Sequence, residues 1–148
     1  MDLRVIYLIR DPRAVMNSRY SRKWCRYQAH CIEPKNLCKF DLADFNAAKE
    51  YSIKYPDNFK YVKYEDLLSD WKSQVISLYQ FVMGNEPGSD FMEKMKEIFI
   101  EHNNGLNKKA SDDINFSMKW KYSLKYEQIQ QIQRDCTVTL KTLGYKLI

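Results

Sequence analysis

Hydrophobic positions near the N-terminus predict a buried strand that is followed directly by a helix. Residues 3–9 form a nearly continuous apolar run rich in Val and Ile, which is typical of a parallel strand covered on both faces. Asp11 and Pro12 then supply a helix cap and a first helical residue, and an apolar face continues from Ala14 to about residue 22. A strand followed at once by a helix indicates the opening of a βαβ unit.

The middle of the chain predicts a second strand. Residues 24–40 lack a clear period and predict an irregular excursion, whereas a helix is expected over about 41–55 and ends at Pro56. Residues 59–64 alternate aromatic, Val and Lys side chains, as strands do. A right-handed crossover makes this strand parallel to the first. The predicted fold class is therefore α/β, with parallel strands over 3–9 and 59–64 and flanking helices.

The last part of the chain predicts three helices. One is capped at residues 69–70 and ends at Gly84, a second opens at Gly88, and a third runs over about 123–144, whereas residues 102–122 are polar and predict a loop. The apolar stripes of these helices are interpreted as core. They comprise Val75, Leu78, Tyr79, Val82, Phe91, Met95, Ile98, Phe99, Ile129, Ile132, Cys136, Leu140 and Leu143.

Composition sets limits on the kind of protein. The chain has 148 residues, one domain's worth, and 45% of them are hydrophobic, which excludes intrinsic disorder as the main state. It contains no run of 18 apolar residues and no signal peptide at residues 1–4. Two covered strands do not form a stable sheet alone. We therefore expect either oligomerisation or further strands outside this sequence.

Charge is concentrated in the first 40 residues. The whole chain carries a net charge of +5, but residues 1–40 hold nine basic and three acidic residues, whereas the remainder is nearly balanced with 15 basic and 16 acidic residues. This asymmetry predicts an anionic ligand or polymer near the first helix, with a solvated basic helix face as the alternative.

The cysteines leave the compartment open. Cys25, Cys31, Cys38 and Cys136 have no C-x-x-C spacing, and the two histidines are far apart, so no metal site is predicted. Three clustered cysteines are compatible with a disulfide in a secretory lumen, and free or buried thiols are equally compatible. Residues 115–117 form a glycosylation acceptor triplet, which also occurs by chance.

Polar side chains at the carboxyl ends of the two strands suggest a ligand site. Arg10 follows the first strand and Tyr64 the second, and ligands of open parallel sheets bind beyond these ends. The helix N-terminus after Arg10 offers free backbone donors to a phosphate, and Ser18 lies two turns into that helix. The alternatives are an ion pair of Arg10 with Asp11 or Glu65 and a solvent-exposed Ser18.

The motif as a whole resembles a known family. Residues 3–19, Leu-Arg-Val-Ile-Tyr-Leu-Ile-Arg-Asp-Pro-Arg-Ala-Val-Met-Asn-Ser-Arg, are similar to the 3′-phosphate-binding segment of the Golgi carbohydrate sulfotransferases, which transfer sulfate to 6-hydroxyls of GlcNAc, galactose or GalNAc. Residues 61–68 resemble the Tyr-Glu-Asp-Leu strand end of that family, and Trp120 with residues 126–129 and 143–145 resembles its closing helix. The resemblance spans nearly the whole chain in the right order.

The resemblance implies a P-loop-like, three-layer sulfotransferase fold that binds 3′-phosphoadenosine 5′-phosphosulfate as sulfate donor. Arg10 and Ser18 would hold the 3′-phosphate, and Tyr64 occupies the position whose ring approaches the adenine. Lys119 and Trp120 lie where the family closes a basic loop over the nucleotide. Lys63 replaces a common Arg, and one ammonium group cannot copy the planar fork of a guanidinium. No catalytic base is identified.

One departure from the family pattern concerns the glycines. Transfer needs a Gly-rich loop around the 5′-phosphosulfate, and the family places it upstream of the segment matched here. Gly84, Gly88, Gly105 and Gly144 do not fit such a loop. Residues 1–148 are therefore interpreted as a C-terminal fragment of a sulfotransferase domain, without the N-terminal P-loop half and inactive alone.

The resemblance also implies a glycan or glycosaminoglycan acceptor and a Golgi lumenal location through an upstream membrane anchor. Two rival functions stay open: an ATP-dependent P-loop kinase relative, and a non-catalytic basic module that binds nucleotide, sulfated glycan or nucleic acid through residues 1–40. The sequence shows no nucleic-acid-binding signature, and no nucleic-acid partner is expected. The acceptor sugar stays undetermined.

Overall fold

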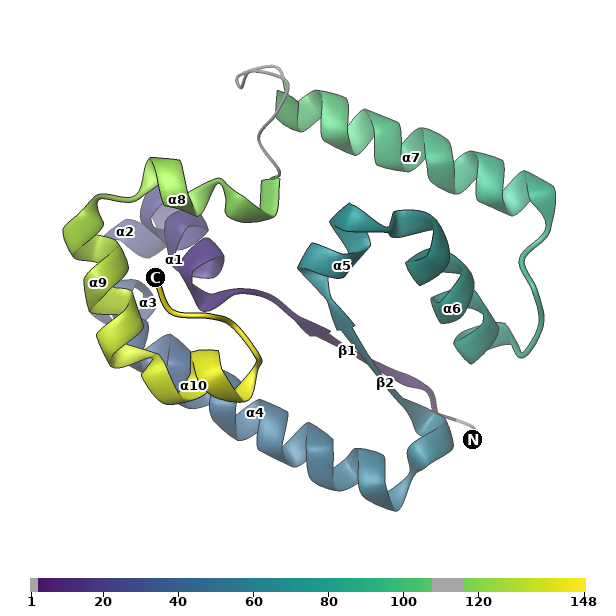
Figure 1. The fold of residues 1–148 in the computed structure, drawn as a ribbon, viewed down its shortest axis with the longest axis horizontal. Coiled ribbons are helices and arrows are strands. Elements are labelled where there is room, and N and C mark those ends of the chain that lie inside the picture. The colour runs from purple at the N-terminus through teal and green to yellow at the C-terminus, as the bar shows by residue number, and fades with distance from the viewer. Residues whose placement is uncertain (1–2, 108–115) are drawn as a thin grey trace.

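A two-stranded parallel sheet lies between two groups of helices (Figure 1). Strand β1 (Val5–Ile9) pairs with β2 (Phe59–Lys63) in a register that runs from Val5 opposite Phe59 to Ile9 opposite Lys63. The computed structural model describes residues 3–107 and 116–148. Both predicted strands and their parallel pairing are confirmed, and the mixed α/β architecture agrees with a partial sulfotransferase fold.

Helices lie on both faces of the sheet, but they do not cover it fully. Ile6 and Leu8 of β1 expose 44 and 55% of their surface. The prediction that this strand is covered on both faces is therefore wrong, because the helices on the face of Ile6 and Leu8 pack mainly on β2.

Helix α4 (Pro34–Lys54) places Phe45 against Tyr7 and Tyr61, with ring centroids 6.4 and 6.0 Å apart. On the opposite face, Lys60 Nζ donates a hydrogen bond of 2.6 Å to Ser77 Oγ of α6 (Trp71–Met83). Successive strand side chains point to opposite faces, so the result is a helix, sheet, helix arrangement of three layers.

The first βα connection forms as its sequence predicts. Helix α1 (Pro12–Ser21) begins with Pro12 in its first turn, and the Asp11 side chain accepts a hydrogen bond from the Arg13 backbone N–H at 2.9 Å. This is the geometry of an N-cap, which satisfies one of the unpaired donors at a helix start. The turn therefore fixes the direction in which α1 leaves the carboxyl end of β1.

The prediction of an irregular segment over residues 24–40 is wrong. These residues form the short helices α2 (Lys23–Arg26) and α3 (Ala29–Ile32) and the beginning of α4. A disulfide between Cys25 and Cys31 joins the two short helices, and Pro34 starts α4, where its missing N–H carries no cost. Because a disulfide stabilises these short helices, they do not need a periodic pattern of apolar residues. A helical signal is therefore absent from the sequence at these positions.

Other boundaries also differ from the prediction. Part of the expected loop over 102–122 is helical, and the expected last helix is divided at Cys136, whose backbone (φ −111°, ψ 12°) leaves the helical region. The remaining elements are η1 (Pro56–Asn58), α5 (Tyr64–Ser69), α7 (Ser89–Asn107), η2 (Phe116–Met118), α8 (Trp120–Ser123), α9 (Tyr126–Asp135) and α10 (Thr137–Thr142). The glycosylation triplet begins at Asn115, outside the described residues.

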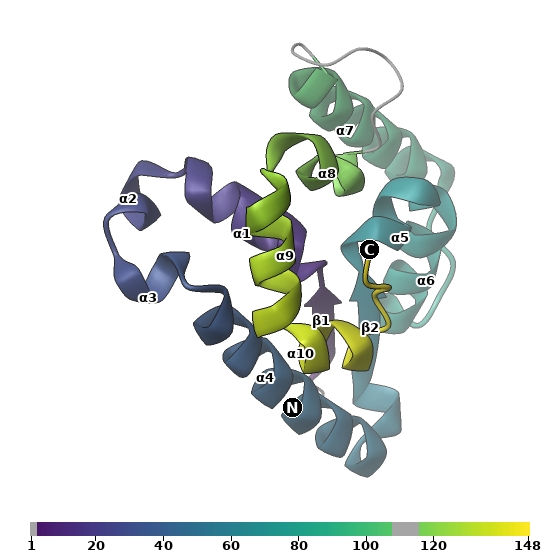
Figure 2. The same cartoon turned by 60° about the vertical axis from the view of Figure 1, so that its left-hand side comes forward.

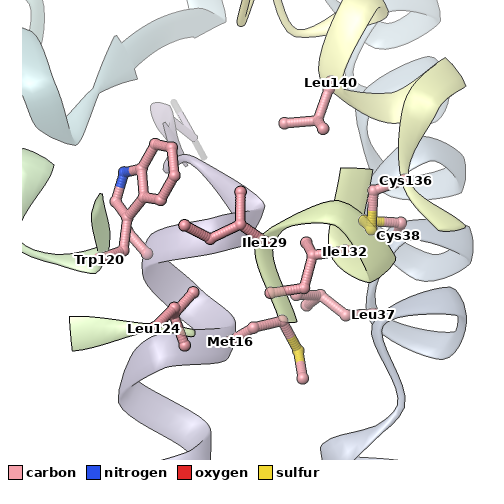
Figure 3. Packing of buried hydrophobic residues seen from close by; sticks show 10 residues of the cluster. Met16, Leu37, Cys38, Trp120, Leu124, Ile129, Ile132, Cys136 and Leu140 are labelled. Atoms are coloured by element: carbon pink, nitrogen blue, oxygen red, sulfur yellow. A yellow bond between two sulfur atoms is a disulfide. The ribbon is translucent and has the colours of Figure 1, made fainter. Parts of the chain in front are cut away.

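The main core lies where α1, α4 and the C-terminal helices meet (Figure 3). A second disulfide, Cys38–Cys136, is buried within it. The predicted core role of the C-terminal stripe is confirmed, because Ile132 and Leu140 are fully buried. The cluster consists of Ala14, Met16, Leu37, Cys38, Trp120, Leu124, Ile129, Ile132, Cys136 and Leu140.

The predicted core role of the α6 and α7 stripes is only partly met. Val82, Phe91 and Ile98 expose 46, 38 and 50% of their surface. The two helices pack on each other through the Trp71–Phe99 and Tyr79–Phe91 ring pairs, at 5.2 and 4.7 Å. Because the two helices pack as a single pair, part of each apolar stripe stays uncovered. Side chains of both stripes border apolar cavities of about 220 and 360 Å³.

Candidate functional site

A cavity of about 390 Å³ lies at the carboxyl end of β1, against α1 and α8. Its described wall contains three cationic side chains and no carboxylate. A cavity of this volume matches the size of small-molecule sites, and its charge favours an anionic ligand. The wall consists of Arg10, Ala14, Asn17, Ser18, Ser21, Arg22, Tyr64, Lys119, Trp120 and Ser123. All five predicted site residues therefore line one cavity.

Arg10 occupies the position where β1 ends. Its guanidinium lies 4.5 Å from the centroid of the Tyr64 ring, a cation–π contact that orients the planar group. Its Nε is buried and has no hydrogen-bond partner in the described part of the chain. A buried N–H without an acceptor is uncommon in folded proteins. This N–H is therefore able to donate a hydrogen bond to a ligand in the cavity.

The alternative in which Arg10 pairs with Asp11 or Glu65 is not observed. Asp11 forms its ion pair with Arg13, and Glu65 accepts hydrogen bonds from the Asp11 backbone N–H at 3.1 Å and from the Tyr145 hydroxyl at 2.8 Å. Both carboxylates are already engaged. The cationic charge of Arg10 is therefore not neutralised by either of them.

The helix N-terminus itself differs from expectation. We expected free backbone donors at the start of α1, but the Arg13 N–H binds the Asp11 carboxylate and the Asp11 N–H binds Glu65. A carboxylate already lies at the positive end of the helix dipole, where it is stabilising. The backbone N–H groups of Asp11 and Arg13 are therefore already paired and are not available to an anion in the cavity.

One face of α1 forms a wall of the cavity. Asn17 and Ser18 each lie three or four residues from Ala14 and from Ser21, so these four residues lie on the same side of the helix. The Ser21 hydroxyl donates to the Ser18 carbonyl at 2.7 Å. Four further polar residues of the wall were not predicted from the sequence: Asn17, Ser21, Arg22 and Ser123. Helical spacing from Ser18 would have indicated Asn17 and Ser21, since they share its face.

Trp120 is a wall of the cavity rather than an exposed platform. Only 1% of its surface is accessible, and its indole Nε1 is buried with no partner among residues 3–107 and 116–148. In Figure 3 the ring lies beside the core, with its nitrogen on the side away from Ile129. Lys119 directly precedes it and also lines the cavity.

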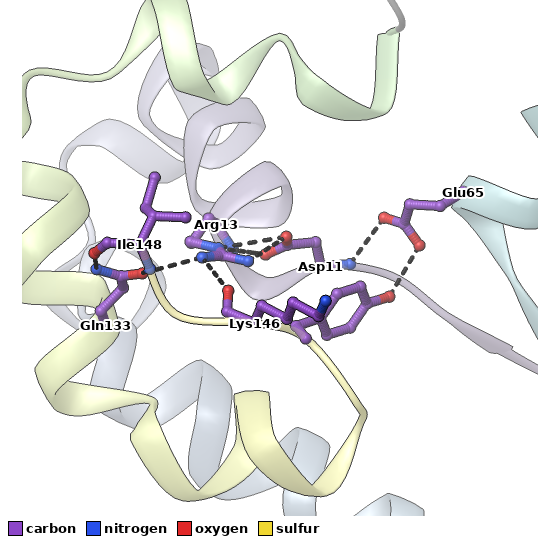
Figure 4. Close-up of polar contacts among 7 residues, drawn as sticks. Asp11, Arg13, Glu65, Gln133, Lys146 and Ile148 are labelled. Carbon is purple, nitrogen blue, oxygen red and sulfur yellow. Dashed lines mark hydrogen bonds and ion pairs between the residues drawn. The ribbon is translucent and has the colours of Figure 1, made fainter.

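A second cavity, of about 420 Å³, also has Trp120 in its wall. Figure 4 shows its polar network, in which Arg13 donates to Asp11, to Gln133 Oε1 and to the Lys146 carbonyl, the last two at 3.0 Å. The Arg13 guanidinium also lies 4.2 Å from the Trp120 ring centroid. This network attaches the C-terminal residues to the start of α1.

Lys63 belongs to the second cavity. Its Nζ lies 4.9 Å from the ring centroid of Tyr145, and burial and the Glu65 hydrogen bond raise the pKa of the Tyr145 hydroxyl. Lys63 therefore does not line the cavity of Arg10 and Ser18. In the described residues, no group of three metal-ligating side chains is found, and no helix has the length and apolar character needed to cross a membrane.

Comparison with known proteins defines the class. The family model of the sulfotransferase domain matches residues 1–144, so the chain belongs to the sulfotransferase domain family. It is similar to carbohydrate sulfotransferase 4 of Mus musculus, with 26% identity over 98% of the chain and 42% of the relative. It is also similar to carbohydrate sulfotransferase 5 of Homo sapiens, with 24% identity over 99% of the chain and 41% of the relative.

A third relative gives a similar match. Carbohydrate sulfotransferase 3 of Tetronarce californica is 25% identical over the whole chain and 37% of the relative. No solved structure matches the chain. The chain spans about two fifths of the length of these relatives. The resemblance predicted from residues 3–19 and 61–68 is confirmed: the chain belongs to the sulfotransferase domain family, and these relatives are carbohydrate sulfotransferases.

Proposed function

We propose that this chain binds 3′-phosphoadenosine 5′-phosphosulfate, the donor that the sulfotransferase family implies, in the cavity beside Arg10. The observation that carries the proposal is the buried Arg10 Nε, which has no partner in the described residues and lies in a wall without carboxylates. A buried unsatisfied donor costs about 1–3 kcal/mol. An anionic acceptor at this place removes that cost and gains a charge-assisted hydrogen bond.

Five residues of the cavity wall have a role in this proposal. Arg10 and Ser18 bind the 3′-phosphate, the group that distinguishes this donor from ATP, and Arg10 offers two parallel donors to its oxygens. Tyr64 holds the guanidinium in place and borders the adenine. Lys119 adds positive charge, and Trp120 presents its buried Nε1 rather than an open ring face. The donor supplies the activated sulfuryl group, and these side chains bind and orient it.

The reaction proposed for the complete protein is transfer of the sulfuryl group to a sugar hydroxyl. Its support is the family and the relatives named carbohydrate sulfotransferases. For the 148-residue chain alone we propose donor binding without transfer. Gly84 ends α6 and Gly144 follows α10, both with positive φ, and Gly88 precedes α7. These glycines serve helix ends and do not build a phosphate loop.

The proposal extends to the Golgi lumen as the compartment. The disulfides Cys25–Cys31 and Cys38–Cys136 support it, because disulfides persist in oxidising compartments and are rare in the cytosol. Non-reducing and reducing mass spectrometry of the protein isolated from its native cells tests this step. Recovery of four free thiols would place the protein in a reducing compartment.

Calorimetry with two nucleotides tests donor binding. Arg10→Ala should weaken the binding of 3′-phosphoadenosine 5′-phosphate by about 2–4 kcal/mol and Ser18→Ala by about 1 kcal/mol. Binding of 5′-AMP should change little, because it lacks the 3′-phosphate. Arg134→Ala, which removes an exposed arginine of α9, is the matched control and should leave both affinities unchanged.

Three results would contradict the proposal. Equal weakening of both nucleotides by Arg10→Ala would make Arg10 a structural residue. Equal competition by ATP would favour the kinase-like alternative. Sulfate transfer from labelled donor to a GlcNAc or galactose acceptor by the 148-residue chain, abolished by Arg10→Ala, would show that this chain is catalytically complete.

A further inference from the structure

A basic and aromatic surface begins at the edge of the Arg10 cavity. Residues 12–32 contain five basic residues and His30 but no acidic residue. Part of this segment forms α2 and α3, which Figure 2 shows at the outer end of α1, away from the sheet. We name the exposed basic and aromatic residues of the segment beyond Ser21 the α2–α3 patch. It consists of Arg22, Lys23, Trp24, Arg26, Tyr27 and His30, all of them exposed.

Two large rings of the α2–α3 patch are open to solvent. Trp24 exposes 65% and Tyr27 86% of its surface. Between them lies Cys25, which is fully buried and bonded to Cys31. The disulfide thus fixes the loop from inside, while the rings and cations point outward. Ordered aromatic and cationic groups bind a partner at a lower entropic cost than flexible ones.

The patch is continuous with the proposed donor cavity. Ser21 and Arg22 line that cavity, and Arg22 also belongs to the patch. A molecule that lies along the patch therefore reaches the mouth of the cavity. In a sulfotransferase, the acceptor must come close to the donor. The location favours the acceptor as the occupant of the patch over an unrelated polyanion.

We propose that the α2–α3 patch binds an acidic glycan, one that carries sulfate or carboxylate groups, as the acceptor chain. Lys23 and Arg26 pair with its anionic groups, and Trp24 and Tyr27 contact the apolar faces of its sugar rings. Arg22 lies between the patch and the cavity. This inference rests on the proposed function and adds the substrate class, an acidic rather than a neutral carbohydrate.

Binding of a labelled chondroitin sulfate hexasaccharide, measured by fluorescence anisotropy at low salt, tests the patch. Lys23→Gln with Arg26→Gln should weaken binding about tenfold or more, and Trp24→Ala with Tyr27→Ala about threefold or more. The matched control is Lys94→Gln with Lys96→Gln, which removes two exposed charges from α7, and it should change binding less than about twofold. A neutral GlcNAc hexasaccharide should bind about tenfold more weakly than the acidic one.

Several results would overturn the inference. Equal loss in the α7 control would mean that binding follows total charge alone. Equal affinity for the neutral hexasaccharide would remove the acidic requirement. Tighter binding of a six-nucleotide oligothymidine than of the acidic glycan would make the patch a nucleic-acid surface. A circular dichroism melt of each variant shows whether a loss of glycan binding is caused by unfolding. If a double variant does not fold, the glycan affinity of the single variant Lys23→Gln is compared with that of the original chain.

The same preparations separate this inference from the proposed function. Lys23→Gln with Arg26→Gln should bind 3′-phosphoadenosine 5′-phosphate as the original chain does, because neither residue lines the cavity. Arg10→Ala should lose nucleotide affinity and keep glycan affinity. Failure of nucleotide binding alone therefore rejects the donor site, and failure of glycan binding alone rejects the patch.

Discussion

Arg13 and Asp11 form a buried ion pair at the start of α1, with Nη2 and Oδ2 2.8 Å apart and Nε and Oδ1 3.0 Å apart. Only 3 and 4% of these two residues are exposed. Because Arg13 neutralises Asp11, the neighbouring Arg10 keeps its charge for a ligand. The two arginines of the Arg-Asp-Pro-Arg turn thus have separate functions, one in stability and one in the proposed binding.

We predict that Arg13→Met destabilises the protein by about 3–5 kcal/mol, since it leaves the Asp11 carboxylate buried without its partner. Arg13 also holds Gln133 and the Lys146 carbonyl. Urea unfolding measures the change. Adding Asp11→Asn should recover part of the loss, because the uncompensated charge is removed. A loss for Arg13→Met below about 1 kcal/mol would contradict a structural role for the pair.

The two disulfides should differ in their contribution to stability. Cys38–Cys136 closes a loop of 98 residues and Cys25–Cys31 one of six. Chain entropy predicts about 5 kcal/mol for the long loop and about 2 kcal/mol for the short one. The pairs Cys38→Ala with Cys136→Ala and Cys25→Ala with Cys31→Ala, compared by thermal unfolding, measure both. The reverse order would show that packing, rather than loop length, dominates.

Gly144 should tolerate a side chain less well than Gly84. Both have positive φ, 78° and 77°, but a Cβ at Gly144 would lie 3.2 Å from Lys63 Nζ, whereas none of the described atoms lies within 4 Å at Gly84. The left-handed conformation costs each alanine about 1–2 kcal/mol. Gly144→Ala should therefore lower the free energy of unfolding, measured by equilibrium unfolding, more than Gly84→Ala does. Adding Lys63→Ala should remove the difference.

Asp41 gives the stability a pH dependence. Burial, with Asp44 adding to it and Arg19 opposing it, raises the pKa of the Asp41 carboxyl from 3.8 to about 6. The folded chain therefore holds this proton more tightly than the unfolded chain, and the associated stability falls as pH rises from about 4 to 6. After discounting for partial solvation, Asp41→Asn should stabilise the protein at pH 7 by about 1 kcal/mol.

Denaturant unfolding at pH 4 and pH 7 tests this expectation. The gain from Asp41→Asn should be present at pH 7 and nearly absent at pH 4. The matched control is Glu50→Gln on the same helix, which removes an exposed carboxylate. An equal gain for the control, or a gain for Asp41→Asn that does not depend on pH, would contradict the role of burial.

Local patterns made much of the fold predictable. The apolar run of β1, the Asp11 cap and the left-handed Gly84 at the end of α6 all depend on neighbouring residues. The pairing of Cys38 with Cys136 depends on tertiary structure, and four cysteines allow three pairings that sequence cannot rank. Arg10 directly follows β1 and Ser18 lies two turns into α1, so the sequence could predict that they share one site. The burial of Trp120 could not be predicted, because it depends on packing against helices that are distant in the sequence.

The Cys38–Cys136 bond also turns residues 38–136 into a covalent ring. Both strand β2 and helix α8 are segments of this ring, whereas β1 and α1 lie on the N-terminal arm attached to it at Cys38. A single backbone cut anywhere inside the ring therefore releases no fragment. The cut chain would keep the Arg10 and Lys119 sides of the cavity on one molecule until a reductant opens the bond.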